Sequence, residues 1–142
     1  MAHHLTDEMI AEAKKRTRYG GHTIAFGPDY TAHHEHNDCI RIAYEWLDAQ
    51  KKLTGPNPRI WGEPIKHMIE RWAGRYVSQD DVAVAAELHP DIKGLYPRYN
   101  IASKLTLPSQ RRLANIGQAG QHPNYYESFE DRDYGRREGP SG

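Results

Sequence analysis

The sequence predicts an all-α fold: a small bundle of four or five helices, with at most a short β element and an extended C-terminal tail. Two long segments place apolar residues at helical spacing, and pairs of glycine and proline punctuate the chain around them. From residue 118 onward the chain carries almost no aliphatic side chains, so it lacks the apolar surface that offsets the entropy of folding. We therefore predict a helical domain over residues 1–117 and an extended or disordered tail over residues 118–142.

The composition narrows the classes of function. The 142 residues include 19 Lys and Arg against 19 Asp and Glu, so the chain lacks the net positive charge that is typical of nucleic-acid-binding domains. Its one cysteine, Cys39, excludes an intramolecular disulfide and fits a reducing compartment. No apolar run resembles a secretory signal or a transmembrane helix. These observations predict no membrane association and a location in the cytoplasm, or in a particle assembled there.

The first predicted element is a helix over residues 5–19. Thr6 is a suitable N-cap, Asp7 suits the positive first turn, and a pair of glycines ends the helix. Its apolar face is narrow, so we expect the helix to depend on packing against another part of the molecule. The short apolar run at residues 23–26 fits one strand or an extended connector.

Three stronger helices follow, over residues 32–53, 63–76 and 78–89. The first two carry wide apolar stripes with helical spacing. The third begins at Ser78, which forms a capping-box pattern with Asp81. The predicted core is drawn from all three: Ile40, Ala43, Tyr44, Leu47, Ile65, Met68, Ile69, Trp72, Val82, Ala85 and Leu88. On the opposite face of the second helix, four polar side chains are expected to point to solvent: Lys66, His67, Glu70 and Arg71.

The remaining segments are less regular. Residues 101–107 fit either a short helix or an extended strand, and residues 109–116 fit one more short helix with Ser109 as its N-cap. The predicted tail is polar but contains aromatic residues, which are effective anchors at protein interfaces. We predict that a partner is bound by four of them: Tyr125, Tyr126, Phe129 and Tyr134.

A cluster of histidines and carboxylates supports a second hypothesis. Imidazole and carboxylate groups together are ligands for zinc, iron or manganese, and one turn of helix separates several members of the cluster. The candidate metal ligands are His33, His34, His36 and Asp38. The alternative interpretation is a polar first turn of the helix that follows. Cys39 lies beside the cluster, and we expect it to be a small buried helix residue rather than a nucleophile.

A third hypothesis is a DNA-binding regulator. The helices at 63–76 and 78–89 abut, in the manner of a helix-turn-helix, although the turn that follows them contains Pro90, Gly94 and Pro97 and is longer than that motif requires. Phosphate and base contacts would come from six polar residues: Arg98, Asn100, Ser103, Lys104, Arg111 and Arg112. The alternative is a helical bundle whose polar loop carries arginines.

The function that the sequence favours is non-catalytic interaction or assembly. We expect the chain to bind a protein partner, or further copies of itself, through its helical surface and its C-terminal tail. No catalytic motif or glycine-rich phosphate loop is present, and this function needs no cofactor. The alternatives are the DNA-binding regulator and an enzyme that uses a divalent metal such as zinc in the cluster from His33 to Asp38.

Overall fold

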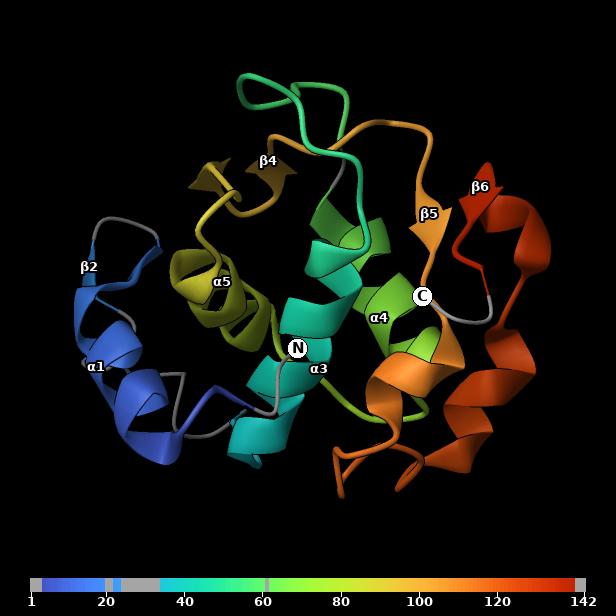
Figure 1. Ribbon diagram of the computed structural model, residues 1–142, viewed down its shortest axis with the longest axis horizontal. Helices are drawn as coiled ribbons and strands as arrows, with labels where there is room; N and C mark the ends of the chain where they lie inside the picture. The colour runs from blue at the N-terminus through green and yellow to red at the C-terminus, as the bar shows by residue number, and fades with distance from the viewer. Residues whose placement is uncertain (1–3, 20–21, 24–33, 61, 140–142) are drawn as a thin grey trace.

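The computed structural model describes residues 4–19, 22–23, 34–60 and 62–139 (Figure 1). The fold is mainly α-helical, as predicted. Its α-helices are α1 (Asp7–Arg16), α3 (Asn37–Asp48), α4 (Gly62–Ala73) and α5 (Gln79–Leu88). Short 3-10 helices are η3 (Gln110–Leu113), η4 (Pro123–Ser128) and η5 (Asp131–Asp133). Two-residue strands are β1 (Arg18–Tyr19), β2 (His22–Thr23), β3 (Gly94–Leu95), β4 (Arg98–Tyr99), β5 (Thr106–Leu107) and β6 (Arg136–Arg137).

Helix α3 lies at the centre of the molecule (Figure 1). It packs against α5 on one side, with α1 beyond α5, and against α4 on the other side. The strands form three separate pairs: β1 with β2 and β3 with β4 are antiparallel, and β5 with β6 is parallel. The helices therefore build the core, and each pair of strands joins two backbone segments at the edge of the core.

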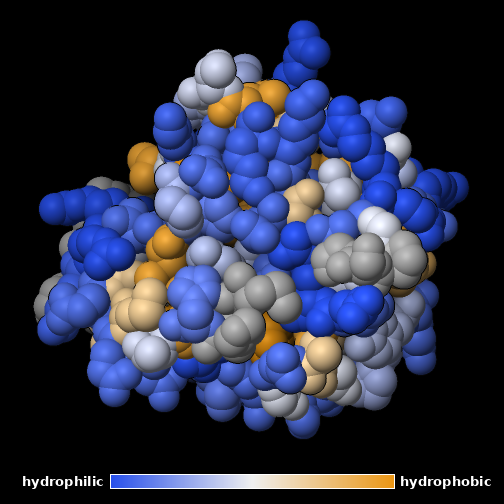
Figure 2. All heavy atoms as spheres, in the orientation of Figure 1, coloured by the Kyte–Doolittle hydropathy of each residue, from blue (hydrophilic) through white to orange (hydrophobic). Residues whose placement is uncertain are grey.

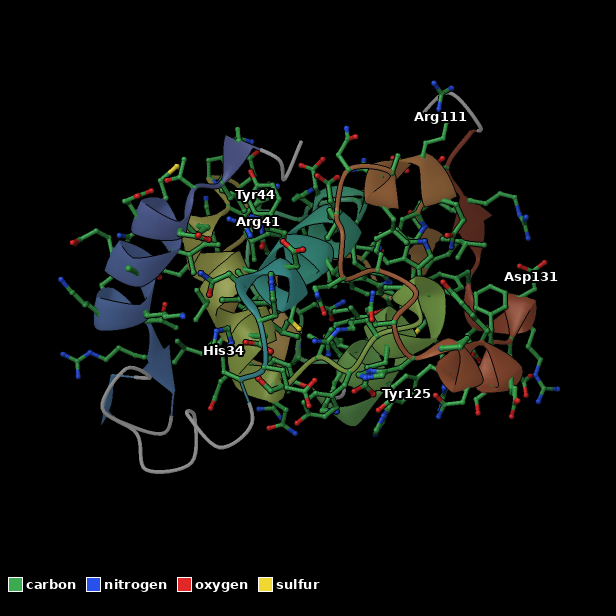
Figure 3. All side chains as sticks on the ribbon, turned by 90° about the horizontal axis from the view of Figure 1, so that it is seen from below. His34, Arg41, Tyr44, Arg111, Tyr125 and Asp131 are labelled. Atoms are coloured by element: carbon green, nitrogen blue, oxygen red, sulfur yellow. The ribbon has the colours of Figure 1, made fainter. Side chains whose placement is uncertain are left out.

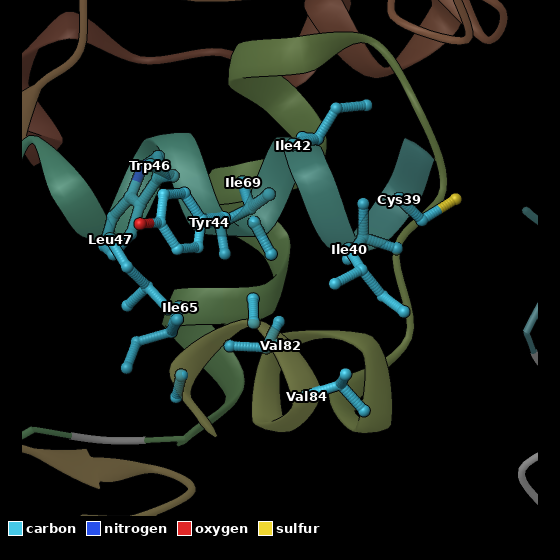
Figure 4. Packing of buried hydrophobic residues seen from close by; sticks show 14 of the residues in the cluster. Cys39, Ile40, Ile42, Tyr44, Trp46, Leu47, Ile65, Ile69, Val82 and Val84 are labelled. Carbon is cyan, nitrogen blue, oxygen red and sulfur yellow. The ribbon is translucent and has the colours of Figure 1, made fainter. Parts of the chain in front are cut away.

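The core forms between α3, α4 and α5, where the three apolar stripes meet (Figure 4). Every predicted core residue is buried except Leu88, which is partly buried and packs against the others. Trp46 and Trp72 are the largest of the fully buried side chains. The indole N–H of Trp72 donates to the carbonyl oxygen of Pro108 at 3.1 Å, so a buried donor is satisfied where the core meets the C-terminal half of the chain.

The predicted caps are confirmed at α1 and α5. The Thr6 hydroxyl accepts a hydrogen bond from the amide of Met9, and Ser78 and Asp81 form a reciprocal capping box. Helix α3 is shorter than predicted. It begins at Asn37 because the ring of His36 accepts the amide of Asp38, which makes His36 the N-cap.

Helix α4 also ends earlier than predicted, at Ala73, because Gly74 turns into the left-handed region at φ 62°. The predicted solvent exposure of Glu70 on α4 is wrong. Glu70 is buried, and its carboxylate accepts hydrogen bonds from Lys66 and from the amide of Val77. The apolar pattern of the sequence does not predict this burial. It depends on two donors that satisfy the carboxylate, the side chain of Lys66 and the backbone amide of Val77 after the turn at Gly74.

The weaker predictions have mixed outcomes. Of the run at residues 23–26, only Thr23 lies within the described residues, where it belongs to β2 and faces Arg18 of β1. The segment at 101–107 is extended and ends in β5. The short helix predicted at 109–116 is the 3-10 helix η3, and Ser109 caps it by accepting from the amide of Arg111.

The predicted extended tail is not confirmed. Residues 118–139 pass along α4 and return to β5 (Figure 1). The amide of Gly120 donates to the carbonyl of Ala73 and that of His122 to the carbonyl of Gly74, both at 2.8 Å. The last turn of α4 leaves these carbonyls without helical partners, and the C-terminal segment supplies the missing donors. Within the described ranges, no helix combines the length and the apolar character needed to cross a bilayer.

Candidate functional site

The histidine cluster predicted to bind metal joins α3 to α5 and α1 (Figure 3). His34 Nδ1 lies 2.7 Å from a carboxylate oxygen of Asp81, and its Nε2 lies 3.1 Å from the side-chain oxygen of Asn37. His36 caps α3, and Asp38 pairs with Arg41 at 2.8 Å.

Among the described residues, no three histidine, cysteine or acidic side chains are placed to hold a metal ion. His33 lies outside the described residues. Metal binding by the predicted set therefore stays a prediction. The observed contacts of His36 and Asp38 lie in the first turn of α3, whereas those of His34 connect this turn to α5 and α1.

Cys39 is buried, as expected. Its thiol lies 3.3 Å from the carbonyl oxygen of Tyr76, and burial raises the pKa of the thiol to about 12. A thiol with this pKa stays protonated at neutral pH, and the thiolate is the nucleophilic form. The geometry therefore supports a packing role for Cys39.

The six residues predicted to contact nucleic acid lie in different environments. Asn100 is buried, and its side-chain amide donates to the carbonyls of Leu53 and Asp91. Ser103 accepts a hydrogen bond from Asn57, and Arg112 lies inside an ion cluster. Four of the six residues are exposed: Arg98, Ser103, Lys104 and Arg111. The helices α4 and α5 are followed by the β3–β4 hairpin, which carries Arg98, whereas Arg111 and Arg112 lie in the 3-10 helix η3. Nucleic-acid binding by the six residues stays a prediction.

Arg112 is the centre of a partly buried ion cluster with three carboxylates. It donates to Glu45 at 2.7 Å, to Asp48 at 2.9 Å and, through two nitrogens, to Glu138. The hydrogen bonds to Glu138 are the main cause that raises the pKa of Arg112, and those same bonds lower the pKa of Glu138. The cluster fixes the end of the C-terminal segment to α3.

His89 extends this cluster without offering a catalytic base. Its Nδ1 accepts the amide of Asp91, so in the neutral ring Nε2 carries the proton and donates to Asp48 at 2.7 Å. This hydrogen bond is the main cause that lowers the pKa of Asp48. Both ring nitrogens are occupied, which leaves the imidazole no lone pair to accept a proton from a substrate.

The four C-terminal aromatics predicted to bind a partner also contact their own chain. The Tyr134 hydroxyl accepts a hydrogen bond from the indole N–H of Trp46 at 3.0 Å, and its ring stacks on Phe129. Tyr126 donates to the carbonyl of Ala73, although 41% of the residue stays exposed. Tyr125 packs edge-on against His122. Partner binding by these residues stays a prediction.

The surface that most resembles a binding site lies at the β3–β4 hairpin and the loop that precedes α4. Figure 2 shows small apolar patches near this edge, and others scattered over the mainly hydrophilic face. A groove is lined there by Pro56, Ile60, Gly94, Leu95, Tyr96, Pro97 and Arg98, which we call the hairpin surface. Leu95 is 67% exposed, the largest exposed fraction of any large apolar residue described. A contiguous apolar groove open to water is typical of an interaction site.

Two buried asparagines hold the walls of this groove together. Asn100 links the hairpin to the preceding loop through its bonds to Leu53 and Asp91, and Asn57 donates to Ile101 and Ser103. Because both walls are fixed by buried hydrogen bonds, the groove is formed before any ligand arrives.

Gly94 gives the hairpin its shape. It has a φ of 106°, and a Cβ atom there would lie 2.4 Å from the carbonyl oxygen of Arg98. Only glycine fits this position without displacing the strand opposite.

A second, smaller hollow of about 140 Å³ lies on the other side of the hairpin. Arg16 and Arg18 stand at its edge, and Ile92, Leu95 and Tyr99 line it. Arg16 forms an exposed ion pair with Glu87 at 3.0 Å. Apolar surface and arginine side chains thus occur together on both sides of the hairpin.

No protein-family model, curated protein or solved structure matches this chain. The site therefore has to be interpreted from its own geometry. Sequence reasoning missed the hairpin surface because Gly94 and Pro97 were interpreted only as turn residues. The available clue was Leu95, an aliphatic side chain between Gly94 and Pro97 in a short polar stretch.

Proposed function

We propose that this protein is a non-catalytic interaction or assembly protein, and that it binds a macromolecular partner through the hairpin surface. The observation that carries the proposal is the exposure of Leu95 beside an apolar groove. Burying a leucine side chain contributes about 1.5–3 kcal/mol, so a partner that covers Leu95 gains this contribution to the free energy of binding. The fixed groove walls favour binding because little order has to be gained.

The chemistry of the described residues agrees with a binding role. Cys39 is buried with a raised pKa, and the ring of His89 is fully engaged. The buried carboxylates Glu45 and Glu70 are paired with Arg112 and Lys66. These groups stabilise the fold and present no base or nucleophile to a substrate.

Site-specific photo-crosslinking tests the proposal. A photoreactive amino acid replaces Leu95 and, in a matched control, Met9, which is also exposed but lies on α1. In the native host, we expect covalent adducts from position 95 and far fewer from position 9. Charge reversal by Arg98→Glu should reduce the adducts from position 95. Equal labelling at both positions, or adducts that Arg98→Glu leaves unchanged, would contradict the proposal.

A further inference from the structure

We infer that the hairpin surface binds the acidic, aromatic segment over residues 123–134 of a second copy of this chain, in a head-to-tail arrangement. This inference rests on the proposed function and names the partner. It follows from the chemistry of two surfaces that the same molecule carries at different places.

The hairpin surface is apolar and bordered by positive charge. Three basic side chains line the groove and the neighbouring hollow, namely Arg16, Arg18 and Arg98, and two more, Arg59 and Lys93, are exposed beside lining residues in the sequence. Among the described residues, Glu87 also lines the hollow, and Asp91 is exposed beside Ile92. Arg16 uses its Nε atom for Glu87, and within the described ranges no ion pair involves Arg59, Lys93 or Arg98. Such a surface fits a segment that combines apolar rings with carboxylates.

The segment at residues 123–134 has that composition. It carries four acidic side chains, Glu127, Glu130, Asp131 and Asp133, against one basic side chain, Arg132. Tyr126, which is 41% exposed, precedes Glu127, and Phe129, which is partly exposed, precedes Glu130. Alternating rings and carboxylates on an outward-facing segment match an apolar groove with a basic border.

The existing ion pairs of this segment do not prevent docking. Glu130 pairs with Arg132, and Asp131 pairs with Arg137, but the arginine side chains of both pairs are more than half exposed. Exposed pairs of this kind contribute about 0–1 kcal/mol, so they can rearrange when new partners arrive. Glu127 and Asp133 form no ion pair within the described residues.

The positions of the two surfaces determine the type of assembly. In Figure 1 the hairpin lies toward the top, whereas η4 and η5 lie at the right-hand edge; Asp131 is at the outer edge in Figure 3. Because the two surfaces are different and separated, contact between them is heterologous and leaves one of each surface open after every addition. The expected product is a series of oligomers rather than a closed two-fold dimer.

The association should be weak and sensitive to salt. Each surface consists of few residues, and small interfaces are typical of transient contacts. The charges lie at the surface, where added salt screens them. Sedimentation velocity of the full chain over a range of concentrations should therefore show a mean mass that rises with concentration and falls with added sodium chloride.

Two sets of surface substitutions test the arrangement. The groove variant carries Leu95→Asp and Arg98→Glu, and the segment variant carries Glu127→Gln and Glu130→Gln, so that the two altered surfaces do not attract each other. Each variant alone should lose self-association by about tenfold or more. An equimolar mixture should recover a complex that stops at the dimer, because only one intact groove and one intact segment remain. Met9→Asp and Arg111→Glu are matched controls that should associate like the wild-type chain.

The outcomes are decisive in both directions. Recovery of a dimer in the mixture supports the inference. A chain that is monomeric at every concentration, or oligomers that neither variant weakens, would overturn it. Circular dichroism of each variant confirms that the fold is intact. A monomeric chain whose position 95 still crosslinks to a different protein, in the Arg98-dependent manner described above, would overturn the self-association alone and leave the proposed function standing.

Discussion

The hairpin surface and the C-terminal segment contain similar residues but differ in what those residues contact. Both contain tyrosine, proline and arginine. In the C-terminal segment, Tyr134 meets Trp46 and Glu138 meets Arg112, so the polar atoms are satisfied within the chain. At the hairpin, Leu95 points its apolar side chain to water. The segment that is poorer in aliphatic residues is therefore fixed to the core, whereas Leu95, an aliphatic residue of the hairpin, stays exposed.

The largest expected effect comes from breaking the ion cluster. Arg112→Ala leaves Glu45 buried without its arginine and should lower the free energy of unfolding by about 3–5 kcal/mol. Arg98→Ala is the matched control at the hairpin, and it should change that free energy by no more than about 0.5 kcal/mol. Urea denaturation measures both. Equal effects of the two substitutions would remove the distinction between the two regions.

Acid should act on the same cluster, with a smaller effect. The folded-state pKa values of Asp48 and Glu138 lie below their ordinary values of 3.8 and 4.5. A carboxyl group with a depressed pKa stabilises the fold fully above its unfolded pKa, and this stabilisation is lost as the pH falls through its folded pKa. The free energy of unfolding should therefore decrease below about pH 4.5. Glu138→Gln should make this decrease shallower; an unchanged slope would show that Glu138 does not contribute.

Removing one hydroxyl tests the attachment of the C-terminal segment more gently. Tyr134→Phe keeps the ring but leaves the buried indole N–H of Trp46 without its acceptor. An unsatisfied buried donor costs about 1–3 kcal/mol, which should appear as a lower thermal midpoint in calorimetry. Tyr125→Phe is the control, since its hydroxyl forms no hydrogen bond within the described residues. A midpoint equal to that of the wild-type chain would place Tyr134 outside the folded unit.

The smallest effect on stability is expected at the hairpin. Leu95→Ala removes a side chain that is mostly in water, so the free energy of unfolding should change by less than about 0.5 kcal/mol. Gly94→Ala differs by one position and should destabilise the hairpin clearly, because the new methyl group meets the carbonyl of Arg98. Chemical denaturation compares the two. A large loss from Leu95→Ala would mean that Leu95 belongs to the core.

Much of the fold was predictable because its signals are local. The apolar stripes of α3, α4 and α5 and the caps at Thr6 and Ser78 depend on neighbouring residues, and they are confirmed. The position of the C-terminal segment was not predictable, because it depends on pairs such as Trp46 with Tyr134, far apart in sequence. Burial of Glu70 depends in the same way on the turn after α4. Composition measures apolar content and carries no information about such pairs.

The candidate site was harder to predict than the fold. The sequence pattern predicts functional roles for the polar residues His34, Asn100 and Arg112. In the structure, their side chains form long-range contacts that stabilise the protein. The exposed residue that matters, Leu95, gives only a weak signal in the sequence, an aliphatic side chain between Gly94 and Pro97. Only the hairpin geometry around Gly94 shows that it stays outside the core.

The central claim is that the C-terminal segment is part of the folded unit, which leaves the hairpin surface for a partner. Amide hydrogen exchange in dilute protein tests this claim most directly. The informative amides are those of Gly120, His122, Arg136 and Glu138, which donate to backbone carbonyls of α4, of the turn after it and of the β5 region. We predict that these amides exchange slowly, at rates that approach those of the α3 core. Exchange at the rate of an unstructured peptide would contradict the claim.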